Sequence, residues 1–261
     1  MDSEAPLAGS IGRRFGDRVA LVTGAAGGIG RETALRLAAE GARVYGADID
    51  DAGLKETAER VTAAGGAIQT SRHDLTRRAE CIGAVEAAVA SFGRLDVLCN
   101  VAGASQFHLF EQMPEEDWNF LLAINLSAVA FTCQAAIPHL LAAQGAIVNV
   151  ASVAGVIGQA YTVAYCAAKG GVVMLTKALA AEYAKTGLRV NAVAPGGVKT
   201  ALHSRLRFPP EMDWKLVKRY MGWRGLCEPH EIAAAIAYLA SEEARFVHGA
   251  ILSIDGGVAG T

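Results

Sequence analysis

Short aliphatic runs alternate with longer alanine-rich segments along the whole 261-residue chain. Most short runs are apolar throughout, which is typical of parallel strands covered on both faces. This alternation predicts an α/β fold, a doubly wound, seven-stranded parallel sheet with helices on both faces. No boundary divides the pattern, so we expect a single domain over 1–261, with an N-terminal extension at 1–15. The expected strands are 19–22, 43–47, 68–71, 95–100, 146–151, 189–193 and 251–254, and the expected helices are 28–40, 52–64, 78–92, 118–142, 161–185 and 229–240.

Charge and cysteine content exclude several classes of protein. The chain has 24 basic and 26 acidic residues, a net charge of −2, so it has no basic excess to neutralise the phosphates of a nucleic acid. Its five cysteines include no Cys-x-x-Cys pair, and their odd number favours reduced thiols over a disulfide framework. Residues 1–17 lack the apolar core of a signal peptide. We therefore expect a cytoplasmic protein without a nucleic-acid partner.

Residues 118–168 contain no Asp, Glu, Lys or Arg. A membrane span needs about 20 mostly apolar residues. Here Asn, Gln, His and Pro residues interrupt the run, and their transfer into lipid is costly. We therefore expect no membrane partner, but buried elements that pack partly against a second subunit.

A glycine-rich turn follows the first expected strand. Gly24, Gly28 and Gly30 lie between that strand and the next helix. Glycines permit a tight turn, let backbone approach a phosphate and allow the helix to pack closely on the strand. The helix N-terminus also offers free N–H groups and a positive dipole end to a pyrophosphate. Glycine-rich turns are common, but the strand before and the helix after predict a dinucleotide site.

Asp48 ends the second expected strand, 24 residues after Gly24. A carboxylate at this place accepts hydrogen bonds from the ribose hydroxyls of NAD and repels the 2′-phosphate of NADP. The alternative is a solvated helix N-cap, because Asp50 and Asp51 lie nearby.

Tyr165 and Lys169 are four residues apart in a helical pattern, which puts both on one helical face. Ser152 lies 13 residues before Tyr165 at the end of the fifth strand, where ligands bind in this architecture. A free phenol has a pKa of about 10, and an ammonium about 5 Å away lowers it by roughly two units. Tyr165 then acts as general acid/base, with Ser152 donating to the substrate oxygen. A surface pair is the alternative for Tyr165 and Lys169.

Thr-Gly-x-x-x-Gly-x-Gly from Thr23 and Tyr-x-x-x-Lys from Tyr165 resemble the short-chain dehydrogenase/reductase family, over nearly the whole chain. The resemblance implies a Rossmann fold, hydride transfer between NAD(H) and a secondary alcohol or ketone, and a homotetramer. Members that use NADP often carry a basic residue where this chain has Gly27, so this position favours NAD(H). The family implies that Lys169 also binds the nicotinamide ribose. It further implies that Asn125 holds a water in a proton relay, with a satisfied packing amide as the alternative.

The resemblance also assigns the remaining dinucleotide contacts. It places the adenine between residues 74 and 75, and the nicotinamide carboxamide against residues 195–200. Val101 departs from the family, which usually has a second asparagine there. The predicted cofactor-binding residues are Gly24, Gly27, Gly28, Ile29, Gly30, Asp48, Ile49, Asp74, Leu75, Asn100, Ala102, Gly103, Tyr165, Lys169, Pro195, Gly196, Val198 and Thr200.

The segment 199–227 breaks the alternation with two adjacent prolines and several aromatic residues. It predicts a substrate lid, with a plain surface insertion as the alternative. Together with Phe107 and Phe110, its aromatics favour an apolar or cyclic substrate. The substrate-pocket candidates are His108, Val153, Gly197 and Trp214. The histidines form no spaced ligand cluster, so we expect no metal.

Two other functions fit parts of the pattern. One is a 3-oxoacyl-carrier-protein reductase of the same family, which would usually prefer NADPH and is disfavoured by Asp48 and Gly27. The other is a catalytically silent dinucleotide-binding protein, against which Ser152, Tyr165 and Lys169 argue. Binding of the cofactor without turnover of any alcohol would distinguish it.

Overall fold

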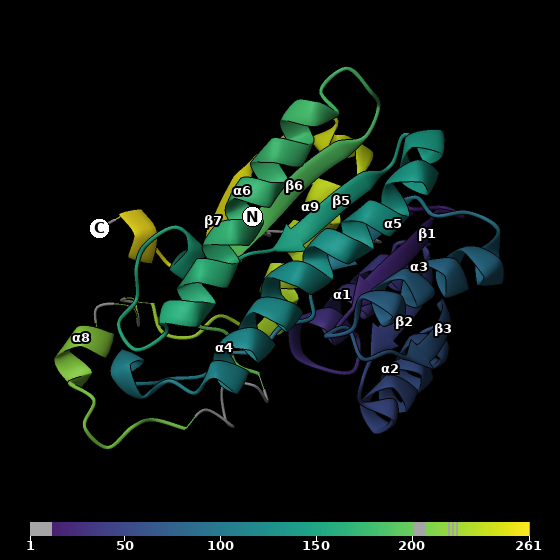
Figure 1. Ribbon diagram of the computed structural model, residues 1–261. Coiled ribbons are helices and arrows are strands. Elements are labelled where there is room, and N and C mark those ends of the chain that lie inside the picture. Colours follow the sequence, from purple (N-terminus) through teal and green to yellow (C-terminus); the bar gives the residue numbers. More distant parts are fainter. Residues whose placement is uncertain (1–11, 201–206, 219, 221, 223, 261) are drawn as a thin grey trace, which may run out of the picture.

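The computed structural model describes residues 12–200, 207–218, 220, 222 and 224–260. Within these residues, seven strands pair in parallel in one sheet of order β3-β2-β1-β4-β5-β6-β7 (Figure 1). The chain starts at the centre of the sheet, builds one half outward, and returns past β1 to build the other, so the doubly wound fold is confirmed. The strands are β1 Val19–Thr23, β2 Arg43–Asp48, β3 Ala67–Arg72, β4 Val97–Asn100, β5 Ala146–Val150, β6 Arg189–Pro195 and β7 Ile251–Ile254.

Helices cover both faces of the sheet. One face carries α3, α5 and α6, which lie in front of the sheet in Figure 1, and the other carries α1, α2 and α9. The α-helices are α1 Gly28–Ala39, α2 Asp51–Ala63, α3 Arg78–Phe92, α4 Glu115–Leu122, α5 Ala128–Ala143, α6 Val163–Glu182, α8 Trp214–Lys218 and α9 Pro229–Ala240. Short 3₁₀ turns are Phe110–Gln112, Val153–Gly155, Glu242–Ala244 and Val258–Gly260.

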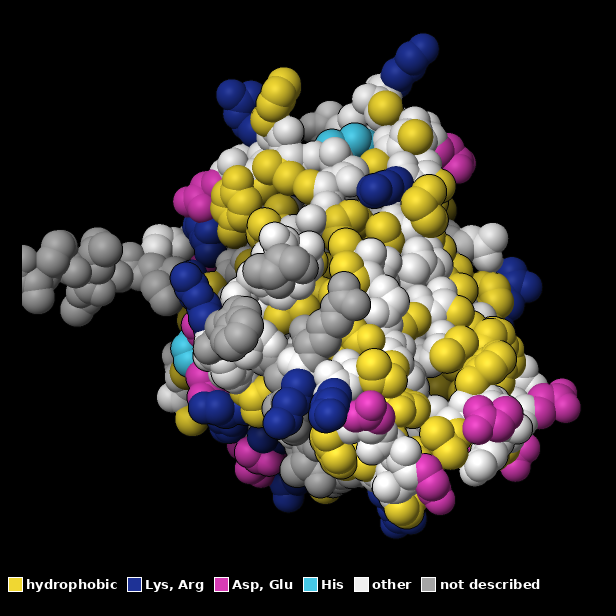
Figure 2. Space-filling view, turned by 90° about the vertical axis from the view of Figure 1, so that its left-hand side faces the viewer, with side chains coloured by type: hydrophobic (Ala, Val, Ile, Leu, Met, Phe, Trp, Pro, Cys, Tyr) yellow, Lys and Arg dark blue, Asp and Glu magenta, His cyan; other side chains and the backbone are white. Residues whose placement is uncertain are grey.

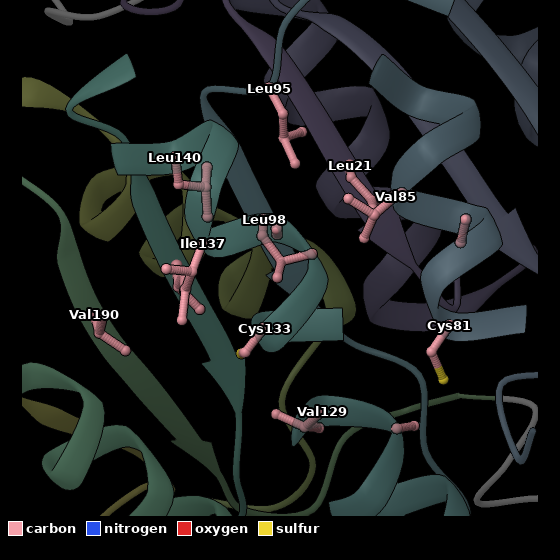
Figure 3. Close-up of a cluster of buried hydrophobic side chains, with 14 of the residues drawn as sticks. Leu21, Cys81, Val85, Leu95, Leu98, Val129, Cys133, Ile137, Leu140 and Val190 are labelled. Atoms are coloured by element: carbon pink, nitrogen blue, oxygen red, sulfur yellow. The ribbon is translucent and has the colours of Figure 1, made fainter. Parts of the chain in front are cut away.

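The apolar strands fill two cores at once. Successive side chains of a strand point to opposite faces, so Leu21 joins the core under α3, α5 and α6, whereas Ala20 and Val22 join the core under α1, α2 and α9. Figure 3 shows the first of these cores, where Leu21 and Leu98 from the sheet meet side chains of α3 and α5. Burial on both faces explains why β1, β4, β5 and β6 are apolar at most positions, whereas β3 at the edge of the sheet is partly exposed and more polar.

The expected helix at 118–142 is interrupted. Between α4 and α5 lies a π-helical turn, Ala123–Ser127, in which the Asn125 amide donates to the carbonyl of Leu121 at 3.0 Å and to that of Ala104 at 2.8 Å. The bond to Ala104 comes from a loop 21 residues away, which a local sequence pattern does not reveal. π-turns occur frequently at functional sites.

Two of the helical segments have the length and hydropathy of membrane spans. They are Glu115–Ala143 and Val163–Glu182, and 44% and 39% of their most apolar windows are buried inside the protein. Their buried residues pack on the sheet as part of one core. Core helices of soluble proteins commonly have this composition, so the two segments are weak indicators of a membrane protein.

The N-terminal segment packs on the domain before β1 begins. Phe15 is fully buried in the core under α1 and α9, and Arg14 forms ion pairs with Glu40 at 2.6 Å and Glu243 at 2.7 Å. The expected extension at 1–15 therefore reaches into the fold, while residues 1–11 lie outside the described part of the chain.

The expected lid at 199–227 is described in part. It contains α8, and a β-bridge between Val198 and Cys227 joins its two ends. Met221 and Trp223, two of the large apolar residues that suggested a lid, lie outside the described residues.

Candidate active site

The carboxyl ends of β1 and β4 meet where the strand order reverses, the place at which open α/β sheets bind ligands. A cavity of about 1700 Å³ lies there, bounded at one end by α2 and at the other by α8. It is larger than the roughly 300–1,000 Å³ of an ordinary ligand pocket, so it has room for a dinucleotide and a second ligand. The predicted site residues that line it are Gly24, Gly27, Gly28, Ile29, Gly30, Asp48, Ile49, Asp74, Leu75, Ala102, Gly103, Asn125, Ser152, Val153, Tyr165, Lys169, Pro195, Gly196, Gly197, Val198, Thr200 and Trp214.

The turn between β1 and α1 depends on glycine at two positions. Gly24 has a φ of +71°, a left-handed conformation that favours glycine. A Cβ atom at Gly30 would lie 1.9 Å from the Gly24 carbonyl oxygen, so only glycine lets α1 begin this close to the strand. The N-cap of α1, Gly27, has no side chain to bind the first N–H groups, which remain available to a pyrophosphate in the cavity.

Asp48 is held at the end of the cavity near α2 by two backbone groups. Its carboxylate accepts hydrogen bonds from the N–H of Ala26 at 3.0 Å and of Asp50 at 3.1 Å. The N-cap of α2 is Asp50, whose carboxylate accepts from the N–H of Gly53. Asp48 is therefore not the helix N-cap that was the alternative interpretation of this residue. A fixed carboxylate at this place fits the ribose diol of NAD.

Asp74 borders the same part of the cavity. Its carboxylate accepts from the hydroxyl of Thr76 at 2.6 Å and from the N–H of Thr76 at 3.1 Å. The hydroxyl bond is the main cause that lowers the pKa of Asp74 below its usual value. The side chain is therefore ionised and fixed at neutral pH, and it presents an acceptor to the cavity.

Ser152, Tyr165 and Lys169 reach the cavity from two elements. Ser152 follows β5 and caps a 3₁₀ turn, accepting from the N–H of Ala154 at 3.1 Å. Tyr165 and Lys169 lie one turn apart on α6, with the Lys169 ammonium 5.8 Å from the Tyr165 ring centroid. The Lys169 Nζ donates to the carbonyl of Val150 at 2.7 Å, so the end of β5 fixes the lysine directly.

Burial controls the protonation of both groups on α6. It lowers the pKa of Lys169 to about 8. Burial also raises the pKa of the Tyr165 phenol, and the Ser152 hydroxyl opposes this by a smaller amount. The predicted lowering of the Tyr165 pKa is therefore wrong, because burial disfavours the phenolate and the Ser152 hydroxyl offsets only part of this effect.

The Asn125 side chain and the Lys169 ammonium both lie close to Gly103, which has no side chain to separate them. The Asn125 amide makes both bonds of the π-turn, and its Oδ1 accepts from the N–H of Ala104 at 3.2 Å. A Cβ atom at Gly103 would lie 2.7 Å from this Oδ1 and 3.5 Å from the Lys169 Nζ. The space beside Gly103 therefore adjoins a hydrogen-bond acceptor and a donor at once.

Asn100 does not line the cavity. Its amide faces the interior, donating to Asn149 Oδ1 at 2.9 Å and accepting from the Thr132 hydroxyl at 2.7 Å, because a buried amide needs such partners. His108 is also outside the cavity. Its N–H donates to the Tyr161 carbonyl, and its ring lies 3.4 Å from Asp117, which turns it toward α4.

Thr23 opens the glycine motif, but its side chain was assigned no role from the sequence. Its hydroxyl accepts from the N–H groups of Val101 at 2.9 Å and Ala102 at 3.1 Å, and so ties the end of β1 to the loop after β4. The departure at Val101 leaves this backbone link intact. The signal was present, because Thr23 is the first residue of the glycine motif. Gln159, which lines the cavity from the loop before α6, carries no motif signal.

Three aromatic side chains pack against one another with tilted rings at the far end of the cavity. The Phe208 ring lies 4.8 Å from Phe107 and 5.1 Å from Trp214, centroid to centroid, and all three line the cavity. Phe208 and Trp214 come from the expected lid and are 39% and 48% exposed. Exposed aromatic surface beside a cavity marks a place where an apolar ligand is covered.

A glycine turn at a helix N-terminus, an acid at the end of β2 and a Ser-Tyr-Lys group on one cavity are the features of a dinucleotide-dependent oxidoreductase. Comparison with known proteins identifies the family. The family profile described as "Enoyl-(Acyl carrier protein) reductase" matches residues 24–259. The chain belongs to the short-chain dehydrogenase/reductase family.

Curated relatives and solved structures resemble the chain over most of its length. A cis-4-hydroxycyclohexanecarboxylate dehydrogenase of Sinomonas cyclohexanicum is 42% identical over 95% of this chain and 98% of its own. A D-threitol dehydrogenase of Mycolicibacterium smegmatis is 40% identical over 94% of both chains. A crystal structure of a short chain dehydrogenase from Mycobacterium paratuberculosis bound to NAD has a TM-score of 0.87 and 31% identity, covering 95% of this chain and 100% of that one.

These likenesses establish the class of reaction. The chain is an oxidoreductase that uses NAD(H) to interconvert a small-molecule secondary alcohol and its ketone. The predicted family, reaction class and cofactor are confirmed.

Proposed function

We propose that this enzyme acts on a cyclic, largely apolar secondary alcohol or ketone, with Tyr165 as general acid/base. The observation that carries the proposal is the convergence of Ser152, Tyr165 and Lys169 on the cavity that begins at the glycine turn. The packed aromatics at the other end supply apolar walls that suit a ring. A relative named for a hydroxycyclohexane substrate supports this choice.

The roles of the side chains follow from their surroundings. NAD, held by the glycine turn and Asp48, would supply the acceptor for the hydride of the alcohol carbon. Ser152 donates a hydrogen bond to the substrate oxygen, and Tyr165 exchanges the proton of that oxygen. Since burial raises the pKa of Tyr165, the phenol is protonated at neutral pH, the form that donates a proton to a ketone. Alcohol oxidation needs the deprotonated form and becomes faster toward alkaline pH.

We assign Asn125 and Lys169 to a proton relay behind Tyr165. A water in the space beside Gly103 would accept from the Lys169 ammonium and donate to Asn125 Oδ1. Lys169 has a pKa of about 8, so it can give up and regain a proton near neutral pH. The π-turn at Asn125 holds the acceptor in place.

We further propose that the enzyme prefers NAD(H) to NADP(H). Asp48 is fixed by two backbone N–H groups and cannot easily turn away from a 2′-phosphate. The neighbouring Gly27 supplies no cation to bind that phosphate. Both features weigh against a 3-oxoacyl-carrier-protein reductase that consumes NADPH.

The proposed assembly is a cytoplasmic homotetramer of single-domain chains. Val163 and Met174 are 40% and 62% exposed on α6, a helix with only three charged residues, and Phe120 is 40% exposed on α4. Figure 2 shows the end of the molecule toward β7 and α8, where hydrophobic side chains cover much of the surface and charged ones lie mostly around its rim. The five cysteines are free, as expected in a reducing compartment.

A substrate panel tests the function. NADH formation is followed at 340 nm with cyclohexanols, steroidal alcohols, straight-chain alcohols and sugar alcohols, each with NAD and NADP in parallel. We expect the highest kcat/KM with NAD and a cyclic alcohol. A preference for polyols would overturn the substrate class. Cofactor binding without any turnover would favour the silent dinucleotide-binding protein, and NADPH-dependent reduction of a 3-oxoacyl thioester would favour the carrier-protein reductase.

A further inference from the structure

Two tyrosine hydroxyls join the lid to the loop before the catalytic helix. The hydroxyl of Tyr161, in that loop, accepts a hydrogen bond from the N–H of Asp213 in the lid at 2.9 Å. In the opposite direction, the hydroxyl of Tyr220, in the lid, accepts from the N–H of Ala160 in the loop at 2.9 Å. The link is therefore reciprocal: each segment supplies one side chain and one backbone group.

The backbone of Tyr161 is held in an unfavourable conformation. Its φ is +66°, in the left-handed region that a bulky residue rarely adopts and that costs of order 1 kcal/mol or more. The Tyr161 carbonyl accepts from the N–H of His108 at 2.9 Å, which fixes the residue from the other side. Such a conformation persists only where the surroundings impose it. Tyr161 lies two residues before the first residue of α6, the helix that carries Tyr165.

The base of the lid is fixed independently of the tyrosines. The N–H of Lys199 donates to the Cys227 carbonyl at 2.9 Å, and the N–H of Cys227 donates to the Gly197 carbonyl at 2.8 Å. The side chains of Lys199 and Glu228 form an ion pair across the same junction. With its base held in this way, the lid can move away from the cavity chiefly at its outer part, where Asp213 and Tyr220 make their bonds.

Aromatic packing alone would not fix the position of the lid. Phe208 packs on Phe107 with its ring tilted by 59°, a contact that tolerates sliding. Hydrogen bonds to backbone N–H groups are directional and allow one position only. The two tyrosines therefore determine where the aromatic wall stands over the substrate end of the cavity.

We propose that Tyr161 and Tyr220 are positioning residues that latch the lid over the bound alcohol. They act on the substrate through Phe208 and Trp214 and take no part in proton transfer. The latch reaches only the loop before α6, whereas Tyr165 lies within the helix itself. This inference rests on the proposed function only in placing the substrate beneath the lid.

Limited proteolysis tests the latch without any turnover. Lys215 and Lys218 are exposed on α8 within the lid, and trypsin cuts them only when the helix opens locally. We expect Tyr161→Phe and Tyr220→Phe each to raise the cleavage rate at these two lysines about two- to tenfold, the range for loss of one hydrogen bond. The peptide ends are identified by mass spectrometry. The control is Tyr238→Phe on α9, which removes a half-exposed hydroxyl outside the lid and should leave the rate unchanged.

Steady-state kinetics supplies the second readout, with the alcohol that is turned over fastest in the panel. Each latch variant should raise KM for the alcohol about two- to tenfold, with kcat within twofold of wild type and an unchanged pH profile. Cleavage rates and KM equal to those of Tyr238→Phe would overturn the latch. A fall in kcat with unchanged KM would also overturn it, because that is the mark of a merely structural role. If the catalytic assignment were wrong, Tyr165→Phe would retain turnover, while the latch variants would still be cleaved faster than wild type.

Discussion

At the scale of single residues, burial acts on the two ionisable groups of α6 in opposite senses. It keeps the Tyr165 phenol protonated and makes the Lys169 ammonium easier to deprotonate. Because the pKa of Lys169 falls and that of Tyr165 rises, the lysine loses its proton at a lower pH than the phenol. The Ser152 hydroxyl completes the arrangement at the end of β5.

Removal of one oxygen atom tests this arrangement. Tyr165→Phe should reduce kcat by at least about a hundredfold, because no other side chain of the proposed set replaces the phenol as acid or base. NAD binding, measured by calorimetry, should change by less than about threefold. Tyr45→Phe, which loses a hydroxyl bonded to Ser71 between β2 and β3, is the control and should keep its kcat. Near-normal turnover by Tyr165→Phe would refute the mechanism.

The buried Lys169 predicts a pH dependence of stability. Its pKa is about 8 in the folded protein and about 10.4 in the unfolded chain, so between these values the unfolded chain binds more protons. The free energy of unfolding therefore rises with pH between these two values, by up to about 1.4 kcal/mol per pH unit. Below pH 8 Lys169 is charged in both the folded and the unfolded state, so its destabilising effect on the folded state no longer changes with pH.

Thermal unfolding measures this effect. The Tm of wild type relative to Lys169→Met should increase between pH 7.5 and pH 9.5. The control is Lys55→Met, because the Lys55 side chain is 81% exposed and its contribution should not vary over this range. A Tm difference between wild type and Lys169→Met that stays constant with pH would show that Lys169 keeps an ordinary pKa.

At the scale of elements, Arg189 holds the end of α9 against the sheet. Its guanidinium is 8% exposed and donates to the carbonyls of Leu239, Ala240 and Ser241 at 2.7 to 3.1 Å. These carbonyls terminate the helix and need partners. Arg189→Met should leave them buried without a donor and lower the free energy of unfolding by about 2–4 kcal/mol.

Chemical denaturation with the far-UV signal measures this loss. The control is Arg245→Met, an exposed arginine in the following turn, which should change stability by less than about 0.5 kcal/mol. Equal stabilities of the two variants would show that the last turn of α9 does not depend on Arg189.

Elements that depend on local patterns were predictable from the sequence, and those that depend on distant contacts were not. Apolar runs identified the strands because burial on both faces leaves a continuous signal. The break at Asn125 was missed, since it requires a bond to Ala104 from another loop. The start of α6 was placed at 161, whereas the left-handed backbone of Tyr161 delays it to Val163.

The candidate site shows the same division. The glycine turn, Asp48 and the Ser152, Tyr165 and Lys169 group have fixed spacings, and all of them line the cavity. His108 was assigned from its place in a loop, but no pattern states which way a loop side chain turns. The bonds of Tyr161 to the lid likewise have no signature in the sequence.

At the scale of the whole molecule, the exposed apolar helices predict assembly. Met174 is 62% exposed on α6 and should be covered by a second chain. Met174→Glu places a charge in that contact and should convert tetramers to smaller species. Size-exclusion chromatography with light scattering measures the mass. Ala90→Glu, an exposed position on α3, is the control and should leave the mass unchanged. A wild-type monomer would refute the assembly.

The strand order has a consequence for biosynthesis. β1 pairs with β2 on one side and with β4 on the other, and β4 is made about 75 residues later. As the chain leaves the ribosome, one edge of β1 stays open until residues 97–100 emerge, and such an edge invites pairing with other chains. Early synthesis is thus the stage at which this enzyme depends most on protection from aggregation.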